Sequence, residues 1–291
     1  MIRRLRITVG VDAERASRHA VDWAIRQAIS QPAEITLLTA FDTIMVAPVE
    51  EEAHLAFERA RIAASAPDAI VETRVVEGTI DDILSRSAER SDLLVIGSHR
   101  TRHSRSVLTG NLPARVARRA RCPVVIVPDD WEPRDGAVVV GLDDDASSDA
   151  ALRRAAGFAR DSGQELRVLH AWMRTDPPSD PVTFYTKVPK GLRDEHRDHL
   201  ADAVHALRRH EPRLAIREDL YEGKATNGLL AIAKTAELVV IGSHRRGAIA
   251  GLLLGSVARD LLHHCRAPLC VVPSKRPVRS ARPAERDEAL A

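Results

Sequence analysis

The chain has 291 residues, enough for two domains of ordinary size, and its 44% hydrophobic and 29% charged residues are the balance of a globular protein. Its 43 basic and 41 acidic side chains nearly cancel and only 3% of residues are aromatic, so neither a charged nucleic-acid surface nor a base-stacking platform is expected. No apolar run is long enough to span a membrane, and the amino terminus has no apolar signal core, so we expect a cytoplasmic protein with no membrane partner.

The first half of the chain alternates predicted strands with predicted helices. Apolar runs predict strands at 5–11, 35–40, 70–76, 93–96 and 124–127. The stretches between them predict helices at 17–29, 51–64, 81–89 and 113–120, the first capped by Ser17. This alternation predicts an open, doubly wound α/β fold with a mainly parallel five-stranded sheet, in which ligands bind beyond the carboxyl ends of the strands.

The second half repeats the same order. Strands are predicted at 137–142, 166–170, 214–220, 238–241 and 269–272, and helices at 193–209 and 257–264, with one more that begins at Ser147 or Ser148 and ends at Gly163. The segment 96–128 matches 241–273 with a constant offset of 145 residues, whereas Asp12 matches Asp143 with an offset of 131. About fourteen residues are therefore inserted after Trp172, where the proline-rich segment 175–190 predicts an exposed loop.

The chain is thus predicted to be an internal duplication. We expect a first domain at 1–128, a linker at 129–136, a second domain at 137–273 and a disordered polar tail at 274–291. The three cysteines, Cys122, Cys265 and Cys270, have no C-x-x-C spacing, and they predict buried free thiols in a reducing compartment.

Each copy places a glycine-containing loop between its fourth strand and the next helix. In the second copy the loop runs from Gly242 to Gly255, and Ser256 opens the helix. Glycine lets backbone approach a ligand closely, and the unpaired N–H groups of a helix N-terminus attract anions, so the pattern predicts a phosphate site. Asp12 and Asp143 end the first strands at the same sheet edge, and two interpretations remain for them: ligand contacts, or caps of the turn that follows.

With both copies considered, the chain resembles the universal stress protein family in its tandem two-domain form. The resemblance covers roughly 5–128 and 137–273, and it is carried by Asp12 and Asp143, by the turns Glu77-Gly78 and Glu222-Gly223, and by the block VIGSH…LLLGSVA…APLCVVP. The nucleotide-binding branch of that family has the motif G-x2-G-x9-G-[ST]. Here Arg100 and Arg245 replace its second glycine, and Asn111 replaces its final Ser/Thr in the first copy.

The resemblance implies a Rossmann-like fold of the adenine nucleotide α-hydrolase type and a set of ligand contacts. In the second domain Asp143 would contact the nucleoside, Ala171 would lie near adenine, Ile241 and Gly242 would flank the ribose, and His244, Arg245, Gly255, Ser256 and Val257 would face the phosphates. The corresponding residues of the first domain are Asp12, Ala40, Ile96, Gly97, His99, Arg100, Gly110, Asn111 and Leu112. For His99 and His244 an ordinary polar loop position remains the alternative. Mg²⁺ would accompany ATP, held by phosphate and water rather than by protein ligands.

The resemblance implies a stress-response module that binds ATP, with the better site in the second domain and a degenerate site in the first. We expect no enzyme, since no convergent acid–base groups are visible, and at most slow ATP hydrolysis. The alternative is a non-nucleotide interaction protein in which Arg100 and Arg245 fill the pockets. In both cases the resemblance implies that 124–127 and 269–272 pair edge to edge, either within the chain or in a homodimer.

Overall fold

The computed structural model describes residues 3–12, 15–41, 48–98, 112–143, 146–173, 190–243 and 254–273. The first half forms β1 (Leu5–Gly10), α1 (Arg15–Ser30), β2 (Ala33–Phe41), α2 (Pro48–Ser65), β3 (Ile70–Glu77), α3 (Ile80–Ser87), β4 (Leu93–Ser98), α4 (Leu112–Arg119) and β5 (Val124–Pro128). The second half forms β6 (Val138–Leu142), α5 (Ala146–Ser162), β7 (Leu166–Trp172), α6 (Lys190–His210), β8 (Ile216–Glu222), α7 (Ala225–Ala233), β9 (Leu238–Gly242), α8 (Ser256–His264) and β10 (Leu269–Val272).

Most of these elements lie within a few residues of the predicted ones, and α7 is the helix that the sequence analysis did not assign. Its apolar sequence has no cap to mark its beginning, because Lys224 at the N-cap makes no side-chain capping bond. The predicted tail and most of the inserted loop lie outside the described residues.

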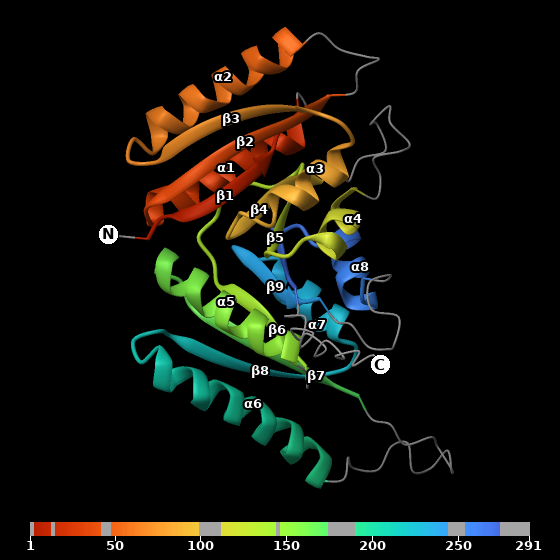
Figure 1. Ribbon diagram of the computed structural model, residues 1–291. Helices are drawn as coiled ribbons and strands as arrows, with labels where there is room; N and C mark the ends of the chain where they lie inside the picture. Colours follow the sequence, from red (N-terminus) through yellow and green to blue (C-terminus); the bar gives the residue numbers. More distant parts are fainter. Residues whose placement is uncertain are drawn as a thin grey trace, which may run out of the picture.

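The strands form one continuous ten-stranded sheet in the order β3-β2-β1-β4-β5-β10-β9-β6-β7-β8. Strands within each half are parallel, and the halves meet where β5 and β10 pair antiparallel, with Cys270 opposite Val125. Edge-to-edge pairing of the last strands is therefore confirmed within the chain, and the two predicted five-stranded sheets are the halves of one sheet. Figure 1 shows α2 and α6 at opposite ends of the molecule, with β5, β9 and the junction between them.

Two buried apolar layers cover the sheet, and each layer contains residues of both halves. One layer includes buried side chains of α1, α2, α5 and α6, and the other includes those of α3, α4, α7 and α8. The central strands β4, β5, β9 and β10 are buried on both faces, which explains their unbroken apolar sequences. In β1 the side chains alternate instead, with Ile7 in the first layer and Thr8 facing the other way.

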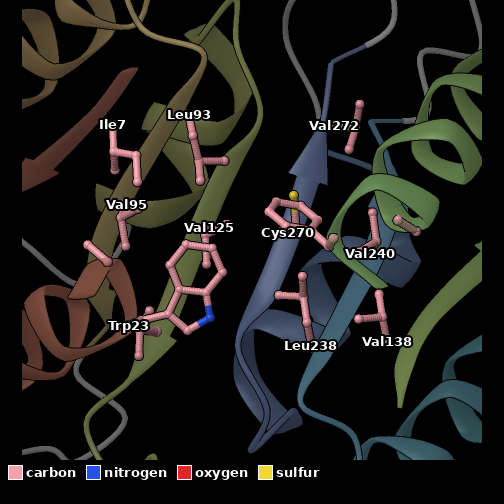
Figure 2. Close-up of a cluster of buried hydrophobic side chains, with 14 of the residues drawn as sticks. Ile7, Trp23, Leu93, Val95, Val125, Val138, Leu238, Val240, Cys270 and Val272 are labelled. Atoms are coloured by element: carbon pink, nitrogen blue, oxygen red, sulfur yellow. The ribbon is translucent and has the colours of Figure 1, made fainter. Parts of the chain in front are cut away.

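The junction between the halves is packed on the face that carries α1 and α5. Trp23 of α1 meets Phe158 of α5 edge to face, with ring centroids 6.0 Å apart. Figure 2 shows Trp23, Val125 and Cys270 in this layer. Burial raises the pKa of the Cys270 thiol to about 12, so this thiol stays protonated and acts as a small apolar side chain.

The segment between the halves is packed rather than loose. Trp131 is 1% exposed and lies edge-on to the ring of His19. A Cβ at Gly136 would come within 2.2 Å of the Thr235 carbonyl oxygen, so glycine is required there. Arg26 of α1 pairs at 3.4 Å with Glu237, which lies just before β9, and this pair joins the two halves directly.

Two glycines mark the same turn in each half. Gly78 after β3 has φ +131° and Gly223 after β8 has φ +136°, a backbone conformation that side chains with a Cβ rarely adopt. Their N–H groups donate to the carbonyls of Phe41 (3.0 Å) and Trp172 (2.9 Å), which end the neighbouring strands. Among the described residues, the search for a helix long and apolar enough to cross a membrane finds none.

Candidate functional site

A cavity lies in the first half at the carboxyl ends of β1, β2 and β4, where the fold predicts a ligand. Its volume is about 210 Å³, and it is lined by residues that include Asp12, Thr39, Ala40, Ile96, Gly97 and Leu112. The structure thus brings together five of the residues that the family resemblance assigns to the first site: Asp12, Ala40, Ile96, Gly97 and Leu112. The volume is below the roughly 300–1,000 Å³ typical of small-molecule sites. The predicted phosphate loop, 99–111, lies outside the described residues.

A serine holds the turn that carries Asp12. The Oγ of Ser17 accepts a hydrogen bond from the N–H of Asp12 (3.1 Å) and donates one to the Asp12 carbonyl (2.6 Å). The second half uses the same device, since the Oγ of Ser148 accepts from the N–H of Asp143 (3.0 Å). The side chains of Asp12 and Asp143 are exposed at these turns, so a ligand can reach both carboxylates.

The prediction that these serines are N-caps is wrong. Helix α1 begins at Arg15 and α5 at Ala146, so Ser17 and Ser148 lie inside the first turn of each helix. Their hydroxyls bind the backbone of the preceding β–α turn. The sequence correctly predicts a serine beside each helix start. A serine hydroxyl can bond either to the N–H groups of the helix or to the turn before it, and the folded shape of the turn selects the second partner here.

In the second half, the predicted residues lie at the corresponding strand and helix ends. Gly242 ends β9, and Ile241 before it is 5% exposed. Ala171 precedes the last residue of β7 and pairs in register with Tyr221. Gly255 is the N-cap of α8 and no side chain caps this helix, so the N–H groups of Ser256 and Val257 are in the first turn, where an anion is favoured.

Gly242 is required by packing alone. A Cβ there would come within 2.5 Å of the Oγ of Ser147 and 2.8 Å of its backbone carbonyl. The N-terminal turn of α5 therefore closes directly over the end of β9. A glycine that sequence reasoning connects with a ribose is explained here by helix–strand contact, and its presence is not by itself a sign of a ligand.

Six predicted contacts lie outside the described residues: His99, Arg100, Gly110, Asn111, His244 and Arg245. The question of whether the arginines fill the pockets or bind phosphate therefore stays open, and their roles remain predictions.

A larger hollow of about 470 Å³ lies at the opposite, amino ends of β1, β2 and β3. It is lined by charges of both signs, and two of its arginines are paired, Arg6 with Asp92 (3.1 Å) and Arg74 with Glu72 (3.0 Å). Because the carboxyl ends of parallel strands are the usual ligand edge, we assign the candidate site to the smaller cavity.

Sequence reasoning missed the polar pair that supports the second strand of each half. Thr39 Oγ1 donates to the carboxylate of Glu51 in α2 (3.2 Å). In the second half the corresponding positions hold His170 and His196, whose ring nitrogens lie 2.9 Å apart. Thr39 was not singled out, and His170 reads from sequence as one residue of an apolar strand. The offsets of 131 and 145 residues could have revealed the correspondence.

Among the described residues, no group of three or more His, Cys, Asp or Glu side chains is arranged to hold a metal ion.

Comparison with known proteins identifies relatives of the whole chain. The sequence model of the universal stress protein family matches residues 4–128 and 136–273. A universal stress protein of Mycolicibacterium smegmatis is 29% identical over 288 residues, which cover 91% of this chain and 96% of the relative. One of Mycobacterium tuberculosis is 27% identical over 299 residues, covering 92% and 94%.

Among solved structures, a universal stress protein from Archaeoglobus fulgidus superposes with a TM-score of 0.67 over 92% of this chain and 96% of its own, at 16% identity. Two solved proteins of the family are described with nucleotides. One is in complex with cAMP (29% identity, 44% of this chain and 98% of that chain, TM-score 0.36). The other, from Arabidopsis thaliana, has AMP bound (19% identity, 43% and 90%, TM-score 0.32).

Proposed function

Because the chain belongs to the universal stress protein family, we propose that it binds an adenine nucleotide at the carboxyl ends of its parallel strands. The observation that carries the proposal is the cavity of about 210 Å³ under the turn after β1, where Asp12, Ala40 and Gly97 converge. It lies at the sheet edge where doubly wound folds bind ligands. An exposed carboxylate at its rim suits the hydroxyl groups of a ribose, which are hydrogen-bond donors.

We propose that the second domain holds the tighter site. Its loop contains Gly247 and Gly251 in addition to the motif glycines, and it leads into Ser256 at the start of α8. The uncapped helix start offers N–H groups to a phosphate, and the Ser256 hydroxyl adds one more donor. The first domain has Asn111 at the matching position, which lacks that hydroxyl, so we expect weaker phosphate binding there.

The proposed role is binding and regulation rather than turnover. Asp12 is the one titratable side chain that lines the described part of the first cavity, and one carboxylate cannot act as both general acid and general base in a single step. Nucleotide would order the loop after the fourth strand and change a surface read by partners. A phosphate-release assay at saturating ATP is expected to show at most slow hydrolysis.

Isothermal titration with ATP, with and without Mg²⁺, tests the proposal, with AMP and cAMP as further ligands. We expect Asp143→Ala to weaken the tighter binding at least about tenfold, the effect of losing one hydrogen bond to a charged group. Asp12→Ala should affect only the weaker binding. Asp68→Ala, at an exposed position next to β3, makes the same charge change and should leave affinity unaltered. Absence of both heat and a melting shift with every nucleotide would refute the proposal.

The alternative function requires a dimer that pairs through the last strands, β5 and β10. In this structure neither strand has a free edge for such pairing. Both β5 and β10 are interior strands, paired with β4 and β9 on one side and with each other on the other. A homodimer would need a different surface.

A further inference from the structure

The sheet ends in two edge strands, β3 and β8, which are the same strand in the two copies of the repeat. Figure 1 shows them at opposite ends of the molecule, next to α2 and α6. Alternate N–H and C=O groups of an edge strand point away from the sheet and can pair with a further strand. The two copies differ in how they protect this edge.

The edge of β8 is covered by a side chain of its own helix. Arg208 of α6 donates to the carbonyl oxygen of Ile216 (3.2 Å) and pairs with the carboxylate of Glu218 (3.0 Å). On the neighbouring strand, Arg167 donates two hydrogen bonds of 2.8 Å to the carboxylate of Asp219. A second copy of β8 laid antiparallel about Glu218 would place two carboxylates opposite each other, which is unfavourable.

The edge of β3 lacks this protection. At the offset of 145 residues, Ala63 stands in place of the helix arginine, and Val71 and Thr73 stand in place of the two strand residues that it binds. Alanine has no donor for the carbonyl of Val71, and threonine carries no charge to repel a second copy. Ile70 at the start of the strand is 48% exposed. The first half therefore presents an edge that another strand can join.

The sequence of β3 is complementary to itself when two copies run antiparallel about Thr73. Glu72 then lies opposite Arg74 of the second copy, and Val71 lies opposite its Val75. Opposite charges and β-branched side chains are stabilising cross-strand pairs. Within one chain Glu72 and Arg74 pair with each other at 3.0 Å, but both are about half exposed, so that pair contributes little and can be exchanged.

Helix α2 provides a second contact on the same face of the sheet. Arg61 pairs with Asp22 of α1 and so marks the side of α2 that faces α1. At about 100° per residue, Ala56 and Ala63 lie on the other side of the helix, beyond β3, and both are exposed. A two-fold axis at Thr73 places α2 beside its own copy, and these small side chains allow the two helices to approach closely.

The charges on this side of α2 are also complementary to themselves. Glu52 and Arg59 are exposed on either side of Ala56, and neither has an ion-pair partner among the described residues. In an antiparallel pair of helices, Glu52 of each copy lies near Arg59 of the other. The strand and the helix therefore indicate the same partner, a second copy of this chain.

The junction inside the chain already uses this arrangement. There β5 and β10 pair antiparallel, and α1 and α5 meet on one face through Trp23 and Phe158. We propose that two copies of the chain pair in the same way through β3, antiparallel about Thr73, with α2 packed beside its copy. The dimer then has one sheet that runs through both molecules, and β8 forms its two outer edges.

Sedimentation equilibrium of the full chain tests the proposal, and we expect a concentration-dependent dimer. Thr73→Lys places two ammonium groups opposite each other at the two-fold axis and should raise the dissociation constant roughly tenfold or more. Glu218→Gln makes the same change of charge at the matching position of β8 and should leave the dimer unaltered. Circular dichroism checks that both variants fold.

Two outcomes of this experiment would overturn the proposal. A wild-type chain that is monomeric at all concentrations its solubility allows would leave the β3 edge to a strand of another protein. A dimer whose dissociation constant does not respond to Thr73→Lys would have to use another surface.

A charge exchange tests the antiparallel register itself. Glu72→Arg alone and Arg74→Glu alone each place like charges opposite each other at two positions, so each variant should dimerise roughly tenfold or more weakly than the wild-type chain. When the two variants are mixed, both cross-strand pairs of the mixed dimer again join opposite charges, and native mass spectrometry should detect that dimer preferentially. Two folded variants that form no mixed dimer would refute this register.

Discussion

Gly242 shows how one residue can satisfy packing and a ligand motif at the same time. Its missing Cβ is required by the contact with Ser147, whatever binds beyond the strand end. The same requirement brings the N-terminus of α5 close to the predicted phosphate loop. A glycine in this motif is therefore explained by the close approach of helix and strand before any ligand needs to be invoked.

We expect Gly242→Ala to lower the free energy of unfolding by about 1–3 kcal/mol, the usual cost of overpacking, because the atoms in the way belong partly to the backbone of Ser147. Urea denaturation checks this. Gly191→Ala in α6 is the control, since no atom lies within 4 Å of its added Cβ and alanine favours the helix. Equal stability of Gly242→Ala and the wild-type chain would show that α5 can move away from β9.

At the scale of elements, the linker acts as part of the interface between the halves. It buries Trp131 and requires glycine at 136, and the adjoining Glu237 pairs with Arg26 of α1. Burial raises the pKa of the Glu237 carboxyl above its ordinary value of 4.5, and Arg26 opposes this only in part. The buried carboxylate of Glu237, whose charge Arg26 offsets only in part, therefore lowers the stability of the fold at neutral pH.

The sign of this pH dependence follows from the raised pKa. The folded state keeps the Glu237 proton to higher pH than the unfolded chain, so stability from this group is present below about pH 4.5 and is lost as pH rises through the folded value. We therefore expect Glu237→Gln to be at least as stable as the wild-type chain at pH 7, with the advantage shrinking toward pH 4.5. Thermal melts across this range check it.

Asp135→Asn is the matched control for that experiment. Asp135 also pairs with Arg26, at 3.7 Å, but its side chain is 90% exposed, so its removal should change stability by less than about 0.5 kcal/mol. A loss of stability in Glu237→Gln at pH 7 would mean that the ion pair with Arg26 outweighs the cost of burial.

At the scale of the whole molecule, the antiparallel pairing of β5 with β10 makes one sheet from two copies of a unit. This pairing covers two strands whose N–H and C=O groups would otherwise be a template for another chain. Because the unit is duplicated within the chain, the edge-to-edge strand pairing that could otherwise join two molecules is made within a single polypeptide.

A fragment of residues 1–135 exposes the outer edge of β5, which pairs with β10 in the full chain. We expect this fragment to self-associate through that edge, because β5 is apolar along its whole length and its outer N–H and C=O groups lose their β10 partners. Sedimentation equilibrium at micromolar concentrations checks the mass, with the full chain as control and with Thr73→Lys in both, so that pairing through β3 does not contribute. A monomeric fragment would show that β5 needs β10 itself rather than any partner strand.

The sequence by itself determined the duplication, the order of the strands and of the helices other than α7, and the sheet edge where a ligand is expected. These follow from local periodicity, a constant offset between copies, and the rule that parallel strands end at one edge, none of which needs a distant contact. The resemblance to the family also pointed to Asp12, Ala40, Ile96, Gly97 and Leu112, which meet at one cavity.

Only the tertiary structure decided the union of the halves into one sheet, the role of Ser17 as a brace for the turn, and the meeting of His170 with His196. Each depends on which partner a group finds across the chain, and the residue types allow several partners. The edge of a strand, a hydroxyl group and an imidazole ring can each form hydrogen bonds with several kinds of partner. The packing of residues far apart in the sequence determines which partner lies close enough.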